Sequence, residues 1–132
     1  MGGEKPLYKF LIHCSIHQIR KGFEANLKKL PFNIDIRYAD LQKEGIITEL
    51  KYTPHLIVVL QNESDSDYLL PLKIKLFVPD FPTLVVSPAI PTSYYHLLKI
   101  IGISHIIQLP VSDEAICGTI LDILQAQPHG KP

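Results

Sequence analysis

The stretch HLIVVL at positions 55–60 begins with a histidine and continues with five apolar residues, of which the middle three are β-branched. A strand that is apolar along its whole length, instead of alternating, is typical of a parallel sheet whose two faces are both covered by helices. The stretch therefore predicts a central, fully buried strand, and the rest of the chain can be interpreted around it.

Four further short apolar runs predict strands on either side of this one. They are LYKFLIHC (7–14), IDIRYA (34–39), TLVVS (83–87) and HIIQL (105–109). Between the runs, apolar residues recur at helical spacing. The predicted helices cover about 16–30, 41–52, 66–76, 92–101 and 112–125.

Local signals mark where these helices start and stop. Pro31 closes the first helix, and Gly102 is a good stop for the fourth. Gly45 weakens the second helix, and Pro71 makes the third one short, kinked or late to start. Ser112 is a suitable N-cap for the fifth helix, and two acids follow it.

The order of elements is strand and helix five times over, which predicts an α/β fold of the doubly wound kind. Such a fold has a five-stranded parallel sheet and right-handed crossovers, with the flavodoxin-like strand order 2-1-3-4-5. Its ligands collect at the carboxyl ends of the strands, where the strand order reverses. His13, Cys14 and Ser15 are expected there, with Leu60 and Gln61 opposite them.

Bulk properties indicate one ordinary globular domain. The chain has 132 residues, and its thirteen basic and thirteen acidic side chains cancel, so charge gives no sign of nucleic-acid or membrane binding. Two cysteines are too few for a disulfide framework, no apolar segment approaches the ~20 residues that span a bilayer, and no secretory signal is evident. We expect a cytoplasmic protein with an N-terminal extension at 1–8, a domain at 9–125 and a flexible tail at 126–132.

Several segments together resemble the receiver domain of two-component response regulators, from about residue 9 to 124. The first strand and its following helix are similar to the version in DNA-binding regulators of the NarL/LuxR kind. The later segments resemble the receiver's third strand with its leading proline, its fourth strand ending in Ser or Thr, and its cis-proline corner after the fifth. The matching stretches are LIHCSIHQIRKGF (11–23), PHLIVV (54–59), FPTLVVS (81–87), GISH (102–105) and LP (109–110).

The residues that carry a receiver's chemistry do not match. Cys14 and Ser15 stand where the family has its Mg²⁺-binding acids, and Leu60 replaces the phosphate-accepting Asp. Leu109 replaces the Lys that contacts the phosphoryl group, and only Ser87 keeps its type. The resemblance therefore implies a degenerate phosphorylation pocket, that is, a pseudo-receiver.

Physical chemistry agrees with this interpretation. Mg²⁺ needs hard oxygen ligands, and a leucine side chain cannot accept a phosphoryl group. Leu60 and Leu109 should also make the pocket smaller and drier than that of a working receiver. We expect no metal, no cofactor and no catalytic residue, and a domain that is not an enzyme.

Two other interpretations of the strand ends remain open. A thiol- or metal-responsive sensor would use Cys14 together with His13 and His17, although backbone-bonded histidine and apolar packing of the thiol are the simpler expectations. A small-molecule binder at the same edge is the other possibility. Cys117 is expected to pack inside the last helix, and the acidic run NESDSD (62–67) to be a solvated loop.

The predicted helix TSYYHLLKI at 92–100 is apolar in most directions, which is unusual for the surface of a monomer. We expect one set of residues to face the sheet and the other to face outward as an interface. The inward set is Tyr95, Leu98 and Ile101, and the outward set is Tyr94, Leu97 and Ile100.

In receivers, the surface formed by this helix, the strand at 105–109 and the last helix serves dimers and partners. The resemblance thus implies a phosphorylation-independent signalling domain that contacts a second copy, another signalling protein or an output domain. By analogy of fold, the resemblance also implies the N-terminal regulatory part of a transcriptional regulator. The domain itself is not expected to bind nucleic acid or a membrane.

Overall fold

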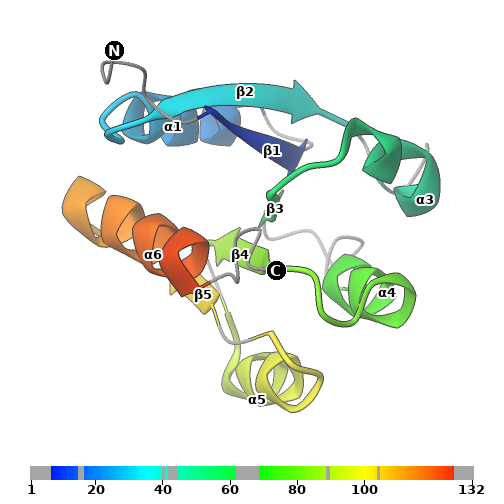
Figure 1. Ribbon diagram of the computed structural model, residues 1–132. Helices are drawn as coiled ribbons and strands as arrows, with labels where there is room; N and C mark the ends of the chain where they lie inside the picture. Colours follow the sequence, from blue (N-terminus) through cyan, green and yellow to red (C-terminus); the bar gives the residue numbers. More distant parts are fainter. Residues whose placement is uncertain are drawn as a thin grey trace.

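A five-stranded parallel sheet forms the centre of the molecule in a computed structural model of the chain (Figure 1). Its strands are β1 (Leu7–Cys14), β2 (Asn33–Tyr38), β3 (Leu56–Leu60), β4 (Thr83–Ser87) and β5 (His105–Gln108). They lie in the order β2-β1-β3-β4-β5, which confirms the predicted doubly wound sheet. The structure describes residues 7–14, 17–39, 41, 45–61, 69–88, 90–103 and 105–126.

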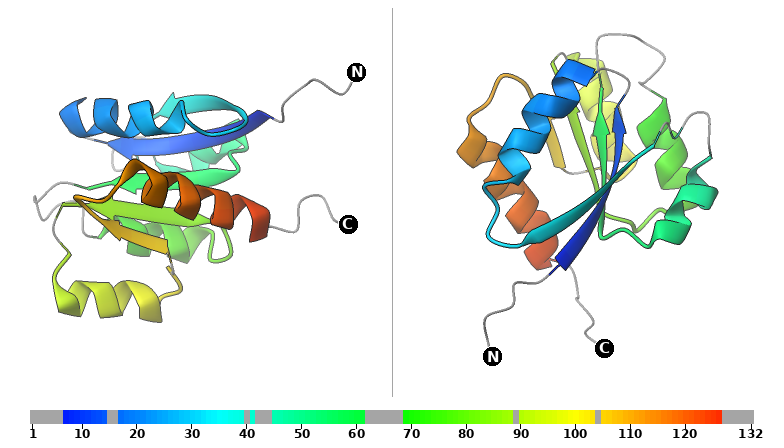
Figure 2. Two further views of the ribbon diagram at one scale, coloured as in Figure 1. Left: turned by 90° about the vertical axis from the view of Figure 1, so that its left-hand side faces the viewer. Right: turned by 90° about the horizontal axis from the view of Figure 1, so that it is seen from above.

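Helices cover both faces of the sheet, as the apolar central strands require. One face carries α1 (His17–Leu27) and α6 (Asp113–Ala126), and the other carries α3 (Ile46–Glu49), α4 (Leu70–Phe77) and α5 (Thr92–Ile100) (Figure 2). No helix in the described part of the chain is long and apolar enough to cross a bilayer.

The connection between β2 and β3 departs from a regular strand–helix alternation. Of the predicted helix over 41–52, the structure describes Leu41, which is helical, and then the four-residue α3 and the 3-10 helix η1 (Leu50–Tyr52). Gly45, just before α3, has a φ of 84°, which an α-helix cannot continue through. The glycine that weakened the prediction thus marks the start of a shorter helix.

Other helix ends follow the local signals of the sequence. Gly102 has a φ of 101° and ends α5, whose last carbonyl groups accept hydrogen bonds from the turn. The Ser112 hydroxyl accepts a 3.1 Å hydrogen bond from the Ala115 amide at the start of α6, so the predicted N-cap is confirmed. Pro71 lies in the first turn of α4, which accordingly begins late, at Leu70.

Strand alternation divides the core between the two faces. Phe10, Ile12 and Leu60 pack with α1 and α6, whereas Leu11 packs with the face that carries α4. All five residues of β3 are buried, as its continuous apolar run predicted. A third cluster under α5 joins Val85 of β4 to that helix.

The predicted rotation of α5 is wrong at its two tyrosines. Tyr94 was expected to face outward, but it is only 8% exposed, whereas Tyr95 is 39% exposed. The buried stripe runs through Tyr94 and Leu98, four residues apart, and Ile101 packs beside it. Leu97 and the 80% exposed Ile100 do lie outside, as predicted.

Candidate functional site

The carboxyl ends of β1 and β3 meet as neighbours in the sheet. Cys14 lies opposite Leu60 in the register, and His13 lies opposite Val59. Because side chains alternate along a strand, Cys14 and Leu60 both pack on the face of α1 and α6. The Cys14–Leu60 pair is therefore an apolar contact at the edge of the core.

Leu109 completes this group from the end of β5. Its amide donates a 2.9 Å hydrogen bond to the carbonyl oxygen of the buried Ser87, and the peptide bond from Leu109 to Pro110 is cis, as the resemblance implies. The Leu109 side chain packs in the same cluster as Cys14 and Leu60. Three of the expected pocket positions are thus brought together, and Ser15 lies outside the described residues.

Leu60 and Leu109 line a cavity of about 310 Å³ between α1 and α6. The described lining is mostly apolar, and the two leucines do not fill the space. The other lining residues are Gly22, Phe23, Asn26, Val86, Pro110, Val111, Asp113 and Ile116.

The described lining of this cavity includes one carboxylate, that of Asp113, which is already paired with a cationic side chain. The Lys29 ammonium donates a hydrogen bond to Asp113 Oδ2 and forms an ion pair with it across the α1–α6 boundary. That hydrogen bond and the charge of Asp113 raise the pKa of Lys29. Within the described residues, no three His, Cys, Asp or Glu side chains are grouped so that they could hold a metal ion.

His13 points to the opposite face of the sheet from Cys14. It is buried, and its Nδ1 accepts a 3.1 Å hydrogen bond from the Leu41 amide. A backbone N–H can only donate, so Nδ1 must carry a lone pair and the proton of the neutral ring sits on Nε2. The expectation of a backbone-bonded histidine is confirmed. The side chain of His17 and the loop 62–67 lie outside the described residues.

Both cysteines pack against the core. Cys14 is half-buried beside the cluster under α1 and α6. Cys117 donates a 3.4 Å hydrogen bond from Sγ to the carbonyl oxygen of Asn26, which joins α6 to α1. Burial raises the pKa of the Cys117 thiol, which keeps it protonated at neutral pH. Cys117 therefore has the packing role predicted for it.

A buried hydrogen bond that the sequence did not reveal links the end of β3 to α5. Gln61 follows Leu60 directly, is buried, and donates from Nε2 to the Tyr94 hydroxyl at 2.8 Å. A glutamine at the end of a fully apolar strand was the available signal, since a buried amide requires a partner. Its partner could not be identified because Tyr94 was assigned to the outer face.

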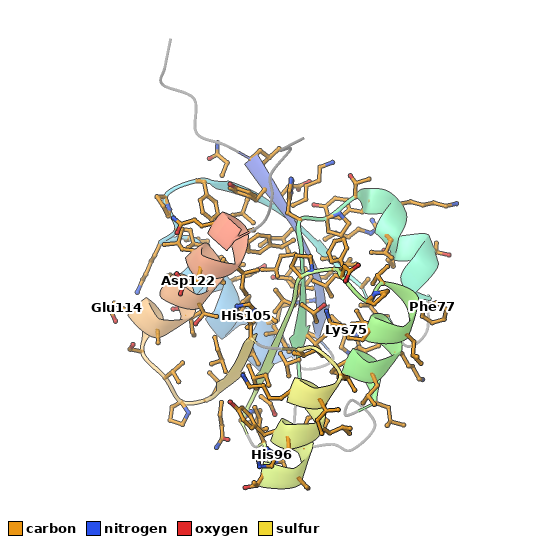
Figure 3. All side chains as sticks on the ribbon, turned by 60° about the horizontal axis from the view of Figure 1, so that its bottom comes forward. Lys75, Phe77, His96, His105, Glu114 and Asp122 are labelled. Atoms are coloured by element: carbon orange, nitrogen blue, oxygen red, sulfur yellow. The ribbon has the colours of Figure 1, made fainter. Side chains whose placement is uncertain are left out.

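The outer surface of α5 carries exposed apolar side chains. Leu97 is 39% exposed and Ile100 is 80% exposed, and Tyr95 adds a ring that lies under the Lys99 ammonium at 5.5 Å. His96 lies on the same helix and is also exposed (Figure 3). Apolar residues grouped in this way on a surface helix are typical of protein interfaces.

His105 begins β5, beside this helix. Figure 3 shows Asp122 of α6 on one side of it and Lys75 of α4 on the other. Burial lowers the pKa of His105, and Lys99 and Lys75 add to this effect, whereas the Asp122 carboxylate opposes it. His105 therefore tends to be neutral near pH 7 in the folded protein.

No protein-family model and no curated protein sequence matches the chain. Solved structures do match over nearly its full length. The chemotaxis protein CheY4 of Vibrio cholerae is 15% identical, with a TM-score of 0.71, and the match covers 90% of this chain and all of that one. A CheY-like response regulator receiver domain from Methanospirillum hungatei JF-1 is 18% identical, with a TM-score of 0.75, covering 94% and 98%.

A LuxR family DNA-binding response regulator from Silicibacter pomeroyi is also similar, at 16% identity and a TM-score of 0.71, covering 91% of this chain and 93% of that one. At such identities the likeness establishes the fold and no more. The chain has the flavodoxin-like α/β fold of CheY-like response regulator receiver domains.

Proposed function

We propose that the chain is a phosphorylation-independent signalling domain, a pseudo-receiver that acts through protein–protein contact. The observation that carries the proposal is the pairing of Cys14 with Leu60 at the carboxyl ends of β1 and β3. The receiver resemblance assigns an acid to the first position and the phosphate acceptor to the second. Here the first is a half-buried thiol and the second a fully buried leucine.

Phosphoryl transfer at this edge lacks both of its chemical requirements. Leu60 offers no oxygen to accept the group, and Leu109 offers no ammonium to stabilise its charge. Asp113, the carboxylate on the cavity wall, is engaged by Lys29. A hard cation such as Mg²⁺ needs several oxygen ligands, which this apolar lining does not supply.

The proposed contact surface consists of α5, β5 and α6, with Leu97 and Ile100 at its centre. Both side chains are exposed, as is the Tyr95 ring, whereas Tyr94 and Leu98 of the same helix are buried. Desolvating the exposed side chains is favourable only against a partner. The partner would be a second copy, another signalling protein or an output domain. The similar LuxR family regulator is described as DNA-binding, so a transcriptional output and a cytoplasmic setting are part of the proposal.

The contact is tested by measuring the mass in solution by light scattering over a range of protein concentrations. We expect a dimer that Leu97→Asp or Ile100→Asp abolishes. Leu76→Asp is the matched control, because Leu76 is 81% exposed but lies on α4. A wild-type chain that is monomeric throughout, or a dimer that only Leu76→Asp disrupts, would contradict a homodimer through α5.

The same measurement with and without reductant separates the proposal from the sensor alternative. A mass independent of reductant is expected, whereas a redox-dependent mass that Cys14→Ser abolishes would favour a thiol sensor. Phosphorylation independence is tested by intact mass spectrometry after incubation with acetyl phosphate and Mg²⁺. No phosphoryl adduct is expected, and a stoichiometric adduct would contradict the proposal.

A further inference from the structure

The cavity between α1 and α6 has the size and lining of a binding site for a small apolar molecule. Its volume of about 310 Å³ lies at the lower end of the range for small-molecule pockets. Phe23, Leu60 and Leu109 give it aromatic and aliphatic walls, and the mouth is formed by Val111 and Asp113.

The two helices are held in positions that keep the cavity open. The Lys29–Asp113 ion pair and the hydrogen bond from Cys117 to the Asn26 carbonyl both join α1 to α6. On the α1 wall, Gly22 adds no side chain, and a Cβ placed there would meet no atom within 4 Å. A larger side chain would therefore have room at this exposed position, which lines the cavity.

Asn26 supplies the cavity's buried polar group. The residue is 8% exposed, and its Nδ2 donates a 3.1 Å hydrogen bond to the Gly22 carbonyl. Its Oδ1 is buried and accepts no hydrogen bond from any residue the structure describes. A buried acceptor without a donor is costly, so it indicates a missing partner. Asn26 lines the cavity, so a molecule bound there could supply the missing donor.

We propose that this cavity binds a small, neutral, largely aromatic molecule with one O–H or N–H group, which donates to Asn26 Oδ1. The walls select an apolar body, and Asn26 Oδ1, the buried acceptor without a donor among the described lining residues, selects the donor. An anion would approach the Asp113 carboxylate, and a cation would find that carboxylate already paired with Lys29. The inference depends on this cavity and not on the α5 surface, so either proposal can fail alone.

The test is an NMR titration of the full chain with 2-naphthol, which has an aromatic body and one hydroxyl donor. The control ligand, 2-methoxynaphthalene, has a similar shape but no donor. We expect saturable shifts of the α1 and α6 amides with 2-naphthol, and about tenfold weaker binding of the methoxy compound. Asn26→Leu should remove this difference between the two ligands.

Variants at the cavity wall locate the site without disturbing the core. Gly22→Leu should abolish binding by filling the cavity, whereas Gly22→Ala should retain it. Val111→Trp, in the exposed loop at the mouth, should also block binding. The proposal is overturned if 2-naphthol produces no saturable shifts, if Gly22→Leu and Val111→Trp bind it like wild type, or if both ligands bind the folded wild type equally.

Discussion

Gln61, the residue after β3, donates a 2.8 Å hydrogen bond from Nε2 to the hydroxyl of Tyr94 in α5. Both side chains are buried. The bond joins the strand edge where a receiver would carry its phosphate acceptor to the helix that we propose as a contact surface. It therefore ties the end of β3 to the buried side of α5.

The first prediction concerns the strength of this bond. Tyr94→Phe should lower the free energy of unfolding by about 1–2 kcal/mol, because it removes the acceptor of a buried amide. Gln61→Leu should also destabilise, and the double variant should lose less than the sum, with a coupling energy of about 1 kcal/mol. Urea unfolding of the four proteins measures the cycle, and additive losses would show that the bond contributes nothing by itself.

A second prediction concerns the two histidines that accept backbone hydrogen bonds. His13→Phe should cost about 1–3 kcal/mol, because the Leu41 amide loses a buried acceptor. His55→Phe is the matched control. His55 Nδ1 accepts a 2.9 Å bond from the Lys9 amide, but the site is only half-buried, so water can replace the ring.

Hydrogen exchange gives an independent check on this pair. The Leu41 amide should exchange faster in His13→Phe, and the unfolding free energy should fall less in His55→Phe. Equal losses in the two variants would mean that burial does not decide the cost of removing the acceptor.

A third prediction concerns pH. Burial lowers the pKa of His105 below its ordinary value of 6.5, so the unfolded chain binds more protons than the folded one between the two pKa values. The free energy of unfolding should therefore fall as the pH decreases through that window, and level off below the folded pKa. Urea unfolding between roughly pH 7.5 and 5 measures this, and His105→Gln should reduce the dependence.

The neighbours of His105 supply the control for this titration. Asp122→Asn should lower the pKa of His105 further, and Lys99→Gln should raise it, as followed by NMR of the His105 ring. A pKa at or above 6.5 in the wild type would contradict the dominance of burial over the Asp122 carboxylate.

A fourth prediction contrasts two glycines. Neither Gly22 nor Gly102 has an atom within 4 Å of a built Cβ, but only Gly102 has a positive φ, of 101°. Gly22→Ala should stabilise the fold by about 0.5–1 kcal/mol, because glycine is unfavourable inside a helix. Gly102→Ala should destabilise it by about 1 kcal/mol or more. Thermal unfolding compares them, and shifts of the same sign would contradict this backbone argument.

Much of the architecture could be predicted because its signals are local. The run TLVVS at 83–87 has the same bounds as β4. The predicted helix ends are also found: α6 is capped by Ser112, α5 ends at Gly102, and the first turn of α4 contains Pro71. The candidate pocket was predicted less completely. Leu60 and Leu109 do converge, but the contribution of Asn26 depends on how α1 packs against α6, which no local pattern encodes.

By itself, the sequence determined the five strands and the helical segments between them. Residue types and their periods are sufficient for these features. Only the tertiary structure decided that Tyr94 rather than Tyr95 is buried, and that a cavity lies between parts of α1 and α6. Neighbouring residues on a helix differ by about 100° of rotation, so when both are aromatic, the contacts with distant elements such as Gln61 choose between them.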